Sequence, residues 1–439
     1  MSDPRIIIGA SHAGSELAVR LRQLDPSTPV VLLGEEEVLP YQRPPLSKSW
    51  IGDPAAGIES VLIRSAEAYA SAGIDARTNA RVAQIDRIGH RLLLESGESL
   101  PYSQLALATG ARARRLILSG SERADQASNV HYLRTLADAQ RLRPQFTRGA
   151  RIAIVGGGYI GLELAALAIK TGLKPTVYEA QSRVLARVAA PQLSAFYEQA
   201  HREAGVDVRS SVQLTGFECA ADGNIRAVLW QDASGTGHRT DVDVVAVGVG
   251  IVPNIELAQA AGLVCASDGL VVDEHCRTSD PSIVAAGDCT SRPVPGQTGT
   301  ARIESVPNAA EQARAAAATL CGRDQPCNSV PWFWSDQYDL KLQTVGLSRG
   351  HDEVAMRGDP AARAFTAFYL RGGVLIAADS VNRPADFMLA RKLVAAGLRI
   401  DAAALADSDT PLKQLIAARG FGFPLLTVCI AAPQNHPRC

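Results

Sequence analysis

Three glycines with the spacing of a dinucleotide-binding turn stand near the middle of the chain. Gly156, Gly158 and Gly161 follow the apolar run Ile152–Val155, and a helical pattern begins behind them. In such a turn the first glycine permits the tight bend, the second lets the backbone approach a pyrophosphate, and the third lets the helix pack on the strand. The free amide groups at the start of the helix can then bind phosphate. The spacing therefore predicts a dinucleotide site.

A second copy of this turn lies at the start of the chain. Gly9, Ser11 and Gly14 follow the β-branched run Arg5–Ile8, so a serine replaces the middle glycine. The serine Cβ should crowd a pyrophosphate slightly, although the hydroxyl can donate a hydrogen bond to a phosphate oxygen. Two copies of the turn indicate two dinucleotide sites in one chain.

Each copy is followed by a second strand-like run with an acidic residue after it, Glu35 in the first copy and Glu179 in the second. A carboxylate at this point suits the hydroxyl pair of a ribose. It also disfavours a 2′-phosphate, so Glu179 favours NAD, although the nearby Arg183 weakens that inference. For the first copy two alternatives stay open, namely Glu36 as the ligand or a solvated acidic turn.

Two other segments carry charged side chains that a ligand could use. The loop from Leu39 to Lys48 contains three prolines, which restrict its backbone and would hold Arg43 and Lys48 rigidly. A plain proline-rich connector is the alternative. Later in the chain a strand-like run ends in Gly287-Asp288, and ligands bind at the carboxyl ends of strands in open α/β sheets.

Composition limits the classes of function. The 439 residues include 44 Lys plus Arg and 45 Asp plus Glu. The chain therefore lacks the excess of basic residues that is typical of nucleic-acid-binding proteins. We expect a cytoplasmic protein that does not bind membranes, because no secretory signal is visible and the late apolar run Leu425–Ala432 is too short to span a bilayer. Among the eight cysteines, of which Cys219 is the first, no C-x-x-C pair occurs. We therefore expect neither a metal site nor an iron–sulfur cluster within the chain.

The order of these patterns predicts an α/β protein in which one nucleotide fold is inserted into another. We assign residues 1–115 and 249–328 to the first nucleotide-binding domain and residues 116–248 to the second. Residues 329–420 read as a separate α+β domain, and residues 421–439 as an atypical tail with an apolar stretch and two cysteines. One nucleotide site nested inside another is an arrangement for moving electrons between two cofactors.

Longer motifs carry a resemblance to a known family. They read GASHAG, YQRPPLSK, LALATGAR, VGGGYIGLE, VGVGIVPN, SDPSIVAAGDC, RIESVPNA and PWFWSDQYDLKLQTVG. The chain resembles the flavoproteins with two dinucleotide-binding domains and the glutathione-reductase fold. Within them it is most similar to the NADH-dependent ferredoxin reductases of bacterial oxygenase systems. The resemblance covers roughly Arg5 to Ala418 and implies FAD in the first domain and NADH in the second.

The resemblance also implies roles for particular residues. The FAD site would comprise Gly9, Ser11, Gly14, Glu35, Arg43, Lys48, Val82, Thr109, Gly110, Arg112, Asp288 and Val306. The NADH site would comprise Gly156, Gly158, Tyr159, Ile160, Glu179, Arg183 and Gly250. Lys48 and Glu163 would form a catalytic ion pair near the hydride-transfer face. The face for the partner would include Arg314, Trp332, Trp334, Arg391 and Lys413, although surface charges are usually only solvated, and tryptophans more often pack domains together.

The activity that the resemblance implies is hydride transfer from NADH to FAD, then single-electron transfer to a separate 2Fe-2S ferredoxin. That ferredoxin would feed a haem monooxygenase or a ring-hydroxylating dioxygenase. The disulfide-reductase branch of the fold needs a cysteine pair in the first domain, and no cysteine precedes Cys219. Rubredoxin reductases, NADH oxidases, proteins like apoptosis-inducing factor and a non-catalytic redox-sensing protein stay open as alternatives. Monomer and homodimer also stay open.

Overall fold

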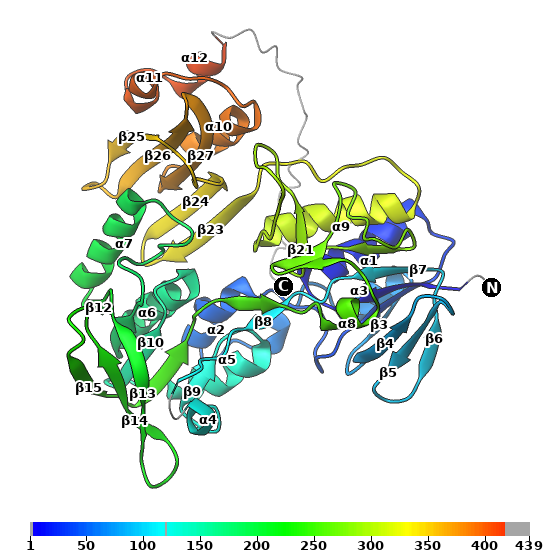
Figure 1. Ribbon diagram of the computed structural model, residues 1–439, viewed down its shortest axis with the longest axis horizontal. Helices are drawn as coiled ribbons and strands as arrows, with labels where there is room; N and C mark the ends of the chain where they lie inside the picture. The colour runs from blue at the N-terminus through cyan, green and yellow to red at the C-terminus, as the bar shows by residue number, and fades with distance from the viewer. Residues whose placement is uncertain (1–2, 119–120, 418–439) are drawn as a thin grey trace, which may run out of the picture.

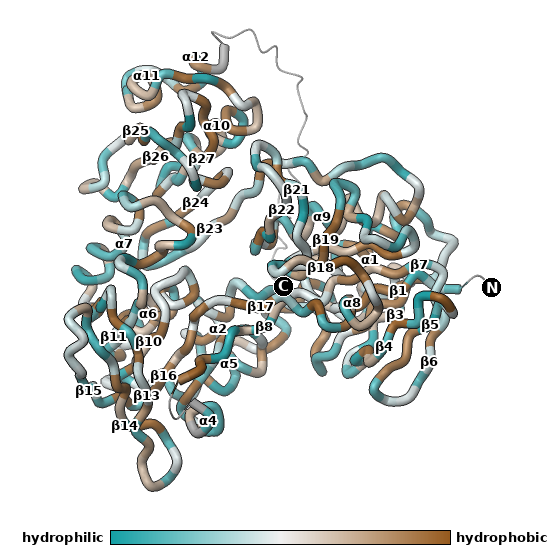
Figure 2. The backbone as a smooth tube through the Cα atoms, in the orientation of Figure 1, coloured by the Kyte–Doolittle hydropathy of each residue, from teal (hydrophilic) through white to brown (hydrophobic). Residues whose placement is uncertain are grey.

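The computed structural model describes residues 3–118 and 121–417 (Figure 1). The predicted tail, 421–439, lies outside these residues. Three units follow one another around a common centre, and each is built on its own five-stranded sheet. Hydrophobic segments concentrate on the strands of these sheets, whereas hydrophilic ones follow many of the connections (Figure 2).

The first sheet is parallel and has the order β20-β7-β1-β2-β3. Its strands are β1 (Arg5–Ile8), β2 (Val30–Leu33), β3 (Ile74–Arg77), β7 (Gln104–Leu107) and β20 (Ile283–Ala285). The strands are short apolar runs, as expected for strands that are covered on both faces. Helices α1 (His12–Leu24) and α9 (Val306–Leu320) lie together against one face and share a core with it. Strand β20 follows the second unit in the sequence, so the second unit is an insertion within the first.

The second sheet is also parallel, with the order β12-β11-β10-β16-β9. Its strands are β9 (Val130–Tyr132), β10 (Arg151–Val155), β11 (Lys174–Tyr178), β12 (Asp207–Arg209) and β16 (Val244–Val247). Helix α6 (Tyr159–Thr171) follows β10, and α7 (Pro191–Glu203) leads towards β12. Each parallel unit also carries a small antiparallel sheet, formed by β4 (Val82–Asp86), β5 (Arg91–Leu94) and β6 (Ser99–Pro101) in the first and by β13 (Gln213–Cys219), β14 (Ile225–Gln231) and β15 (Gly237–Asp241) in the second.

A two-stranded ribbon joins these two units. Strand β8 (Ala111–Ala113) leaves the first unit, and β17 (Ile251–Pro253) returns to it. The two strands pair antiparallel, with Ala113 opposite Ile251. The chain therefore enters and leaves the second unit at one place (Figure 1).

The third unit is an antiparallel sheet with the order β23-β24-β27-β26-β25. Its strands are β23 (Trp332–Gln337), β24 (Leu340–Gly346), β25 (Glu353–Asp359), β26 (Ala364–Arg371) and β27 (Val374–Val381), followed by α10 (Pro384–Ala395), α11 (Ala402–Ala406) and α12 (Leu412–Ala417). Residues of β24, β26 and β27 share a hydrophobic core with α6 and α7. The third unit thus packs on the second, with β23 beside α6 (Figure 1).

The starts of α9 and α1 follow from their local sequences. Helix α9 begins at Val306, and Pro307 occupies its first turn, where the missing N–H costs nothing. The Ser305 hydroxyl caps the helix by accepting a hydrogen bond from the amide of Asn308. Helix α1 likewise begins at His12, inside the first glycine turn.

Candidate functional site

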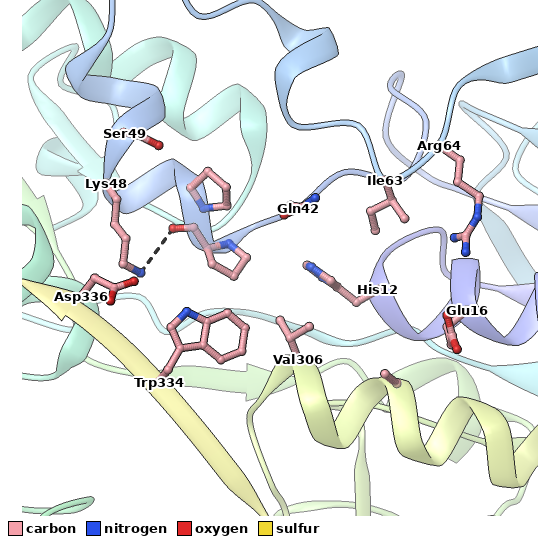
Figure 3. Close-up of a pocket in the computed structure, with 13 residues that line it drawn as sticks. His12, Glu16, Gln42, Lys48, Ser49, Ile63, Arg64, Val306, Trp334 and Asp336 are labelled. Carbon is pink, nitrogen blue, oxygen red and sulfur yellow. Dashed lines mark hydrogen bonds between the residues drawn. The ribbon is translucent and has the colours of Figure 1, made fainter. Parts of the chain in front are cut away.

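A cleft of about 440 Å³ opens where the first and third units meet (Figure 3). Trp334 of β23 and Val306 of α9 lie along one side of it, and the proline-rich loop lies opposite. His12, from the start of α1, reaches towards the middle. Further lining residues are Glu16, Gln42, Pro44, Pro45, Lys48, Ser49, Ile63, Arg64, Ala310 and Asp336. A ligand in this cleft would touch the first glycine turn and the third unit together.

Lys48 and Glu163 form a largely buried ion pair beside this cleft. The Lys48 ammonium lies 2.8 Å from Glu163 Oε1, and the two side chains are 21% and 2% exposed. The carboxylate also accepts hydrogen bonds from the hydroxyls of Ser47 at 2.5 Å and Ser335 at 2.6 Å. These donors come from the loop and from β23, whereas Glu163 lies on α6 of the second unit. The carboxylate therefore ties all three units together at one point, and the expected ion pair is present.

Arg43 of the proline-rich loop is held in place by four hydrogen bonds. The Arg43 guanidinium donates hydrogen bonds to Glu36 at 2.8 Å, to the Arg134 carbonyl at 2.7 Å, to the Tyr41 hydroxyl at 3.2 Å and to the Ser11 hydroxyl at 3.3 Å. Burial disfavours its charge, but Tyr41 and Glu36 outweigh that, so the pKa of Arg43 is raised. The loop is therefore a rigid mount for a cation and more than a connector.

The first glycine turn is built around the start of α1. Gly9 has φ +113°, and a Cβ there would lie 2.1 Å from the backbone oxygen of Ala108, just after β7. A Cβ on Gly14 would lie 1.9 Å from the Gly9 oxygen. Ser11 has φ −139°, which any residue can adopt, so the fold itself accepts the serine. No side chain caps α1, and Arg43 faces its start. Free amides beside the partly buried Arg43 guanidinium fit the pyrophosphate of FAD.

Burial and the neighbouring Arg43 lower the pKa of His12 to about 4, so this imidazole is neutral at pH 7. The side chain stands in the cleft as a hydrogen-bonding group without charge. Sequence reasoning did not single out this histidine, although it lies within the GASHAG motif.

The remaining residues expected at FAD lie on several elements of the first unit. Asp288 accepts a hydrogen bond from Arg134 at 2.8 Å, and Thr109 donates one to the Asn254 carbonyl at 2.7 Å. Arg112 lies on the ribbon, paired with Glu256 at 2.7 Å. Gly110 faces open space, and Val82 on β4 packs against a hydrophobic core of the first unit. Glu35 is largely exposed and lies 3.7 Å from Arg81. Their contacts with FAD stay predictions.

In the second glycine turn, two glycines are required by the packing of the fold and one borders open space. A Cβ on Gly156 would lie 2.5 Å from a backbone oxygen, and one on Gly161 would lie 2.1 Å from the Gly156 oxygen. A Cβ on Gly158 would meet nothing within 4 Å. Close packing therefore explains the first and third glycines, whereas the middle one borders the open space that a pyrophosphate would need.

Around the second turn, the Glu179 carboxylate accepts hydrogen bonds from the amides of Gly157 and Gln181, both at 2.7 Å. The Arg183 guanidinium is directed to Ser194 and to the carbonyls of Ala186 and Ala189. The other residues expected at NADH are Tyr159, whose ring packs 4.6 Å from that of Phe333, the 42% exposed Ile160, and Gly250 with φ +103°. Their contacts with NADH stay predictions.

The residues expected to face a partner lie on four elements, namely β23, α10, α9 and α12. Trp332 and Trp334 lie on β23 with ring centroids 5.8 Å apart, and the Arg391 guanidinium lies 5.0 Å from the Trp332 ring centre. Arg314 lies on α9 and pairs with Glu16 at 3.0 Å, and Lys413 is an exposed residue of α12. Only Trp334 lines the cleft among these five. Arg391 is held by aromatic packing and is not merely solvated.

Two parallel dinucleotide-binding folds, one inserted into the other, with a buried ion pair between them and an antiparallel unit at the cleft, define an oxidoreductase of the glutathione-reductase type. The chain belongs to the pyridine nucleotide-disulphide oxidoreductase family, whose model matches residues 4–313. Residues 332–416 match the reductase C-terminal domain. FAD and NAD(H) are the cofactors that this membership implies.

Relatives along nearly the whole chain agree with this assignment. Putidaredoxin reductase of Pseudomonas putida is 43% identical over 95% of this chain and 97% of its own. The ferredoxin–NAD(+) reductase component of the anthranilate 1,2-dioxygenase system of Burkholderia cepacia is 41% identical over 94% of this chain and 100% of its own. The crystal structure of a covalent putidaredoxin reductase–putidaredoxin complex matches with a TM-score of 0.90 at 43% identity, over 95% of this chain and 99% of that one. The resemblance to ferredoxin reductases of oxygenase systems is confirmed.

Proposed function

We propose that this protein carries electrons from NADH through FAD to a separate 2Fe-2S ferredoxin, which in turn serves a bacterial oxygenase. The observation that carries the proposal is the buried pair of Lys48 and Glu163. It joins the helix of the second glycine turn to the loop beside the first, next to a cleft that His12 enters. A charged pair at the junction of two dinucleotide-binding folds is where two such ligands would meet.

The side chains divide the work as follows. The start of α1, with Arg43 and Arg134, would hold the FAD pyrophosphate, and Asp288 its ribityl chain. The start of α6, with Glu179, would hold NADH. When bound, FAD would accept a hydride from NADH and release the electrons one at a time. The Glu163 carboxylate, 2.8 Å from the Lys48 ammonium, fixes the position of that side chain.

The electron acceptor is a separate protein in this proposal. Relatives named for ferredoxin reduction and the covalent complex with putidaredoxin support it. We assign the docking face to Trp332, Trp334, Arg314, Arg391 and Lys413, of which Trp334 lines the cleft on the side of the third unit. We also assign residues 1–115 and 249–328 to FAD, 116–248 to NADH and 329–420 to the third domain. No helix among the described residues is long and apolar enough to cross a bilayer. As a separate part of the proposal, we place the protein in the cytoplasm.

Anaerobic mixing with NADH tests the first half of the proposal. The FAD-loaded protein should lose its flavin absorbance, faster with NADH than with NADPH. A panel of 2Fe-2S ferredoxins, scored by NADH-dependent turnover at increasing salt, tests the second half. Turnover should fall with ionic strength, because charge-steered encounters weaken as salt screens them. Absence of bleaching refutes the proposal; bleaching followed only by oxygen consumption identifies an NADH oxidase.

A further inference from the structure

A chain of hydrogen bonds runs from the protein surface to the Glu163 carboxylate. The Tyr338 hydroxyl lies 2.9 Å from His201 Nδ1, and His201 Nε2 lies 2.8 Å from Gln337 Oε1. The Gln337 amide donates to the Ser335 hydroxyl at 3.2 Å. Ser335 in turn donates to Glu163 Oε1 at 2.6 Å, the oxygen that also holds Lys48. Four residues thus link the surface to the ion pair.

The direction of every bond in this chain follows from its inner end. Glu163 is paired with Lys48 as a carboxylate and only accepts, so the single Ser335 proton points at it. Ser335 can then only accept from Gln337, which turns the amide NH₂ inward and its oxygen towards His201. That oxygen requires a proton on His201 Nε2, which leaves Nδ1 to accept from Tyr338. All four hydrogen bonds therefore point towards the carboxylate.

Water does not reach the three inner residues of this chain of hydrogen bonds. Ser335 and His201 are 0% exposed and Gln337 is 1% exposed. Burial lowers the pKa of His201 to about 4, so the imidazole is neutral at pH 7 and has a single N–H to donate. Its partner Tyr338 has φ +56°, an uncommon conformation for a bulky residue, and places its hydroxyl against the imidazole.

The chain also crosses a boundary between units. His201 lies on α7 of the second unit, whereas Ser335, Gln337 and Tyr338 belong to the third. Hydrogen bonds that point the same way polarise one another, more strongly in a low-dielectric interior. A donor at the His201 end therefore strengthens the Ser335 hydrogen bond to Glu163 at the other end.

We propose that His201 is a positioning residue for electron entry: through Gln337 and Ser335 it orients the Glu163 carboxylate that holds Lys48. The inference rests on the function proposed above, because it gives the ion pair a role in reduction by NADH. A role limited to packing α7 against the third unit would need the shape of the imidazole but not its Nε2 proton.

A double-mutant cycle tests the proposal by anaerobic stopped-flow reduction of the FAD-loaded protein. His201→Leu should slow reduction at saturating NADH about fivefold, the size expected when one polarising hydrogen bond is lost. His201→Gln, which keeps an N–H donor near the same position, should recover at least half of the wild-type rate. In the background of Glu163→Gln, His201→Leu should have no further effect, since it acts through that carboxylate. Additive losses would overturn the proposal.

His131→Leu is the matched control. His131 is also a buried histidine of the second unit with a pKa lowered to about 4 by burial, and its Nε2 has no partner among the described residues. Its replacement should leave the rate of reduction within twofold of wild type. A fivefold loss in this control would show that any buried histidine of the unit matters, and would overturn the proposal.

A second readout does not depend on activity. Histidine ¹⁵N and ¹³C resonances of the wild-type protein at pH 7 should show His201 as the neutral tautomer protonated at Nε2. The Nδ1-protonated tautomer or an imidazolium would overturn the proposal even if the variants were slow. Failure of the proposed function is distinguishable, because the wild-type protein itself would then not be reduced by NADH.

Discussion

Replacing Glu163 with glutamine removes the negative charge beside Lys48 while keeping the shape of the side chain. The carboxylate accepts three donors and is 2% exposed, whereas glutamine offers one acceptor oxygen and turns an NH₂ group towards the others. A hydrogen bond to a charged group contributes about 1.5–3 kcal/mol. Lys48 is 21% exposed, so solvent screens part of this. We therefore expect a loss of about 1.4 kcal/mol in the reduction step, which is about tenfold in rate.

The assay is anaerobic stopped-flow reduction followed at the flavin absorbance over a range of NADH concentrations. The limiting rate should fall about tenfold, while half-saturation by NADH should change by less than about twofold, because Glu163 acts on the reacting pair and not on nucleotide binding. Glu311→Gln is the control, since the Glu311 carboxylate of α9 also accepts a hydrogen bond from a serine hydroxyl, that of Ser329. A limiting rate equal to that of wild type would refute the reasoning. So would an equal loss in the control.

Three further outcomes follow from the geometry. Gly158→Ala should leave the thermal unfolding temperature unchanged but weaken NADH binding in a titration. Gly161→Ala should lower the unfolding temperature, because its Cβ would lie 2.1 Å from a backbone oxygen. Equal behaviour of the two variants would contradict this. Burial raises the pKa of Asp379 to about 7, above its unfolded value, so its contribution to stability should be present below about pH 4 and be lost as pH rises towards about 7. Denaturation at pH 5 and pH 8 should show Asp379→Asn to be the more stable form at pH 8 by a few kcal/mol, and a constant difference would argue against it. Arg292→Met should lower the free energy of unfolding by about 2–4 kcal/mol, because two buried acceptors and one partly buried acceptor lose their donor. Arg277→Met, at an exposed ion pair, should change it by less than about 0.5 kcal/mol. Urea denaturation that ranked the two variants equally would contradict this.

Local patterns were sufficient to predict both dinucleotide folds. Short apolar runs ending in glycine turns define β1 and β10 and the helices behind them, because those contacts lie close together in the sequence. The resemblance of the longer motifs brought Lys48 and Glu163 together, and the structure forms that pair.

The remainder of the site depends on contacts between units, which no local pattern reveals. Ser335 and His201 have ordinary types and unremarkable spacings, and they matter only because the third unit packs on α6 and α7. Ser47 was within reach of sequence reasoning, since it stands next to Lys48 in the same motif. Arg134 could not be predicted in this way, because its partner Asp288 stands 154 residues further along the chain, beyond the inserted unit.

The ribbon of β8 and β17 makes the inserted unit a cassette. Its two ends lie side by side in a pair of antiparallel strands. The inserted unit is therefore connected to the first unit in the same way as a surface loop. Coenzyme preference can therefore change by exchange of the segment between the two strands without rebuilding the FAD side. The contacts of α6 and α7 with the third unit set the limit, since a replacement must still present a carboxylate at Glu163 and a donor at His201 to the same face.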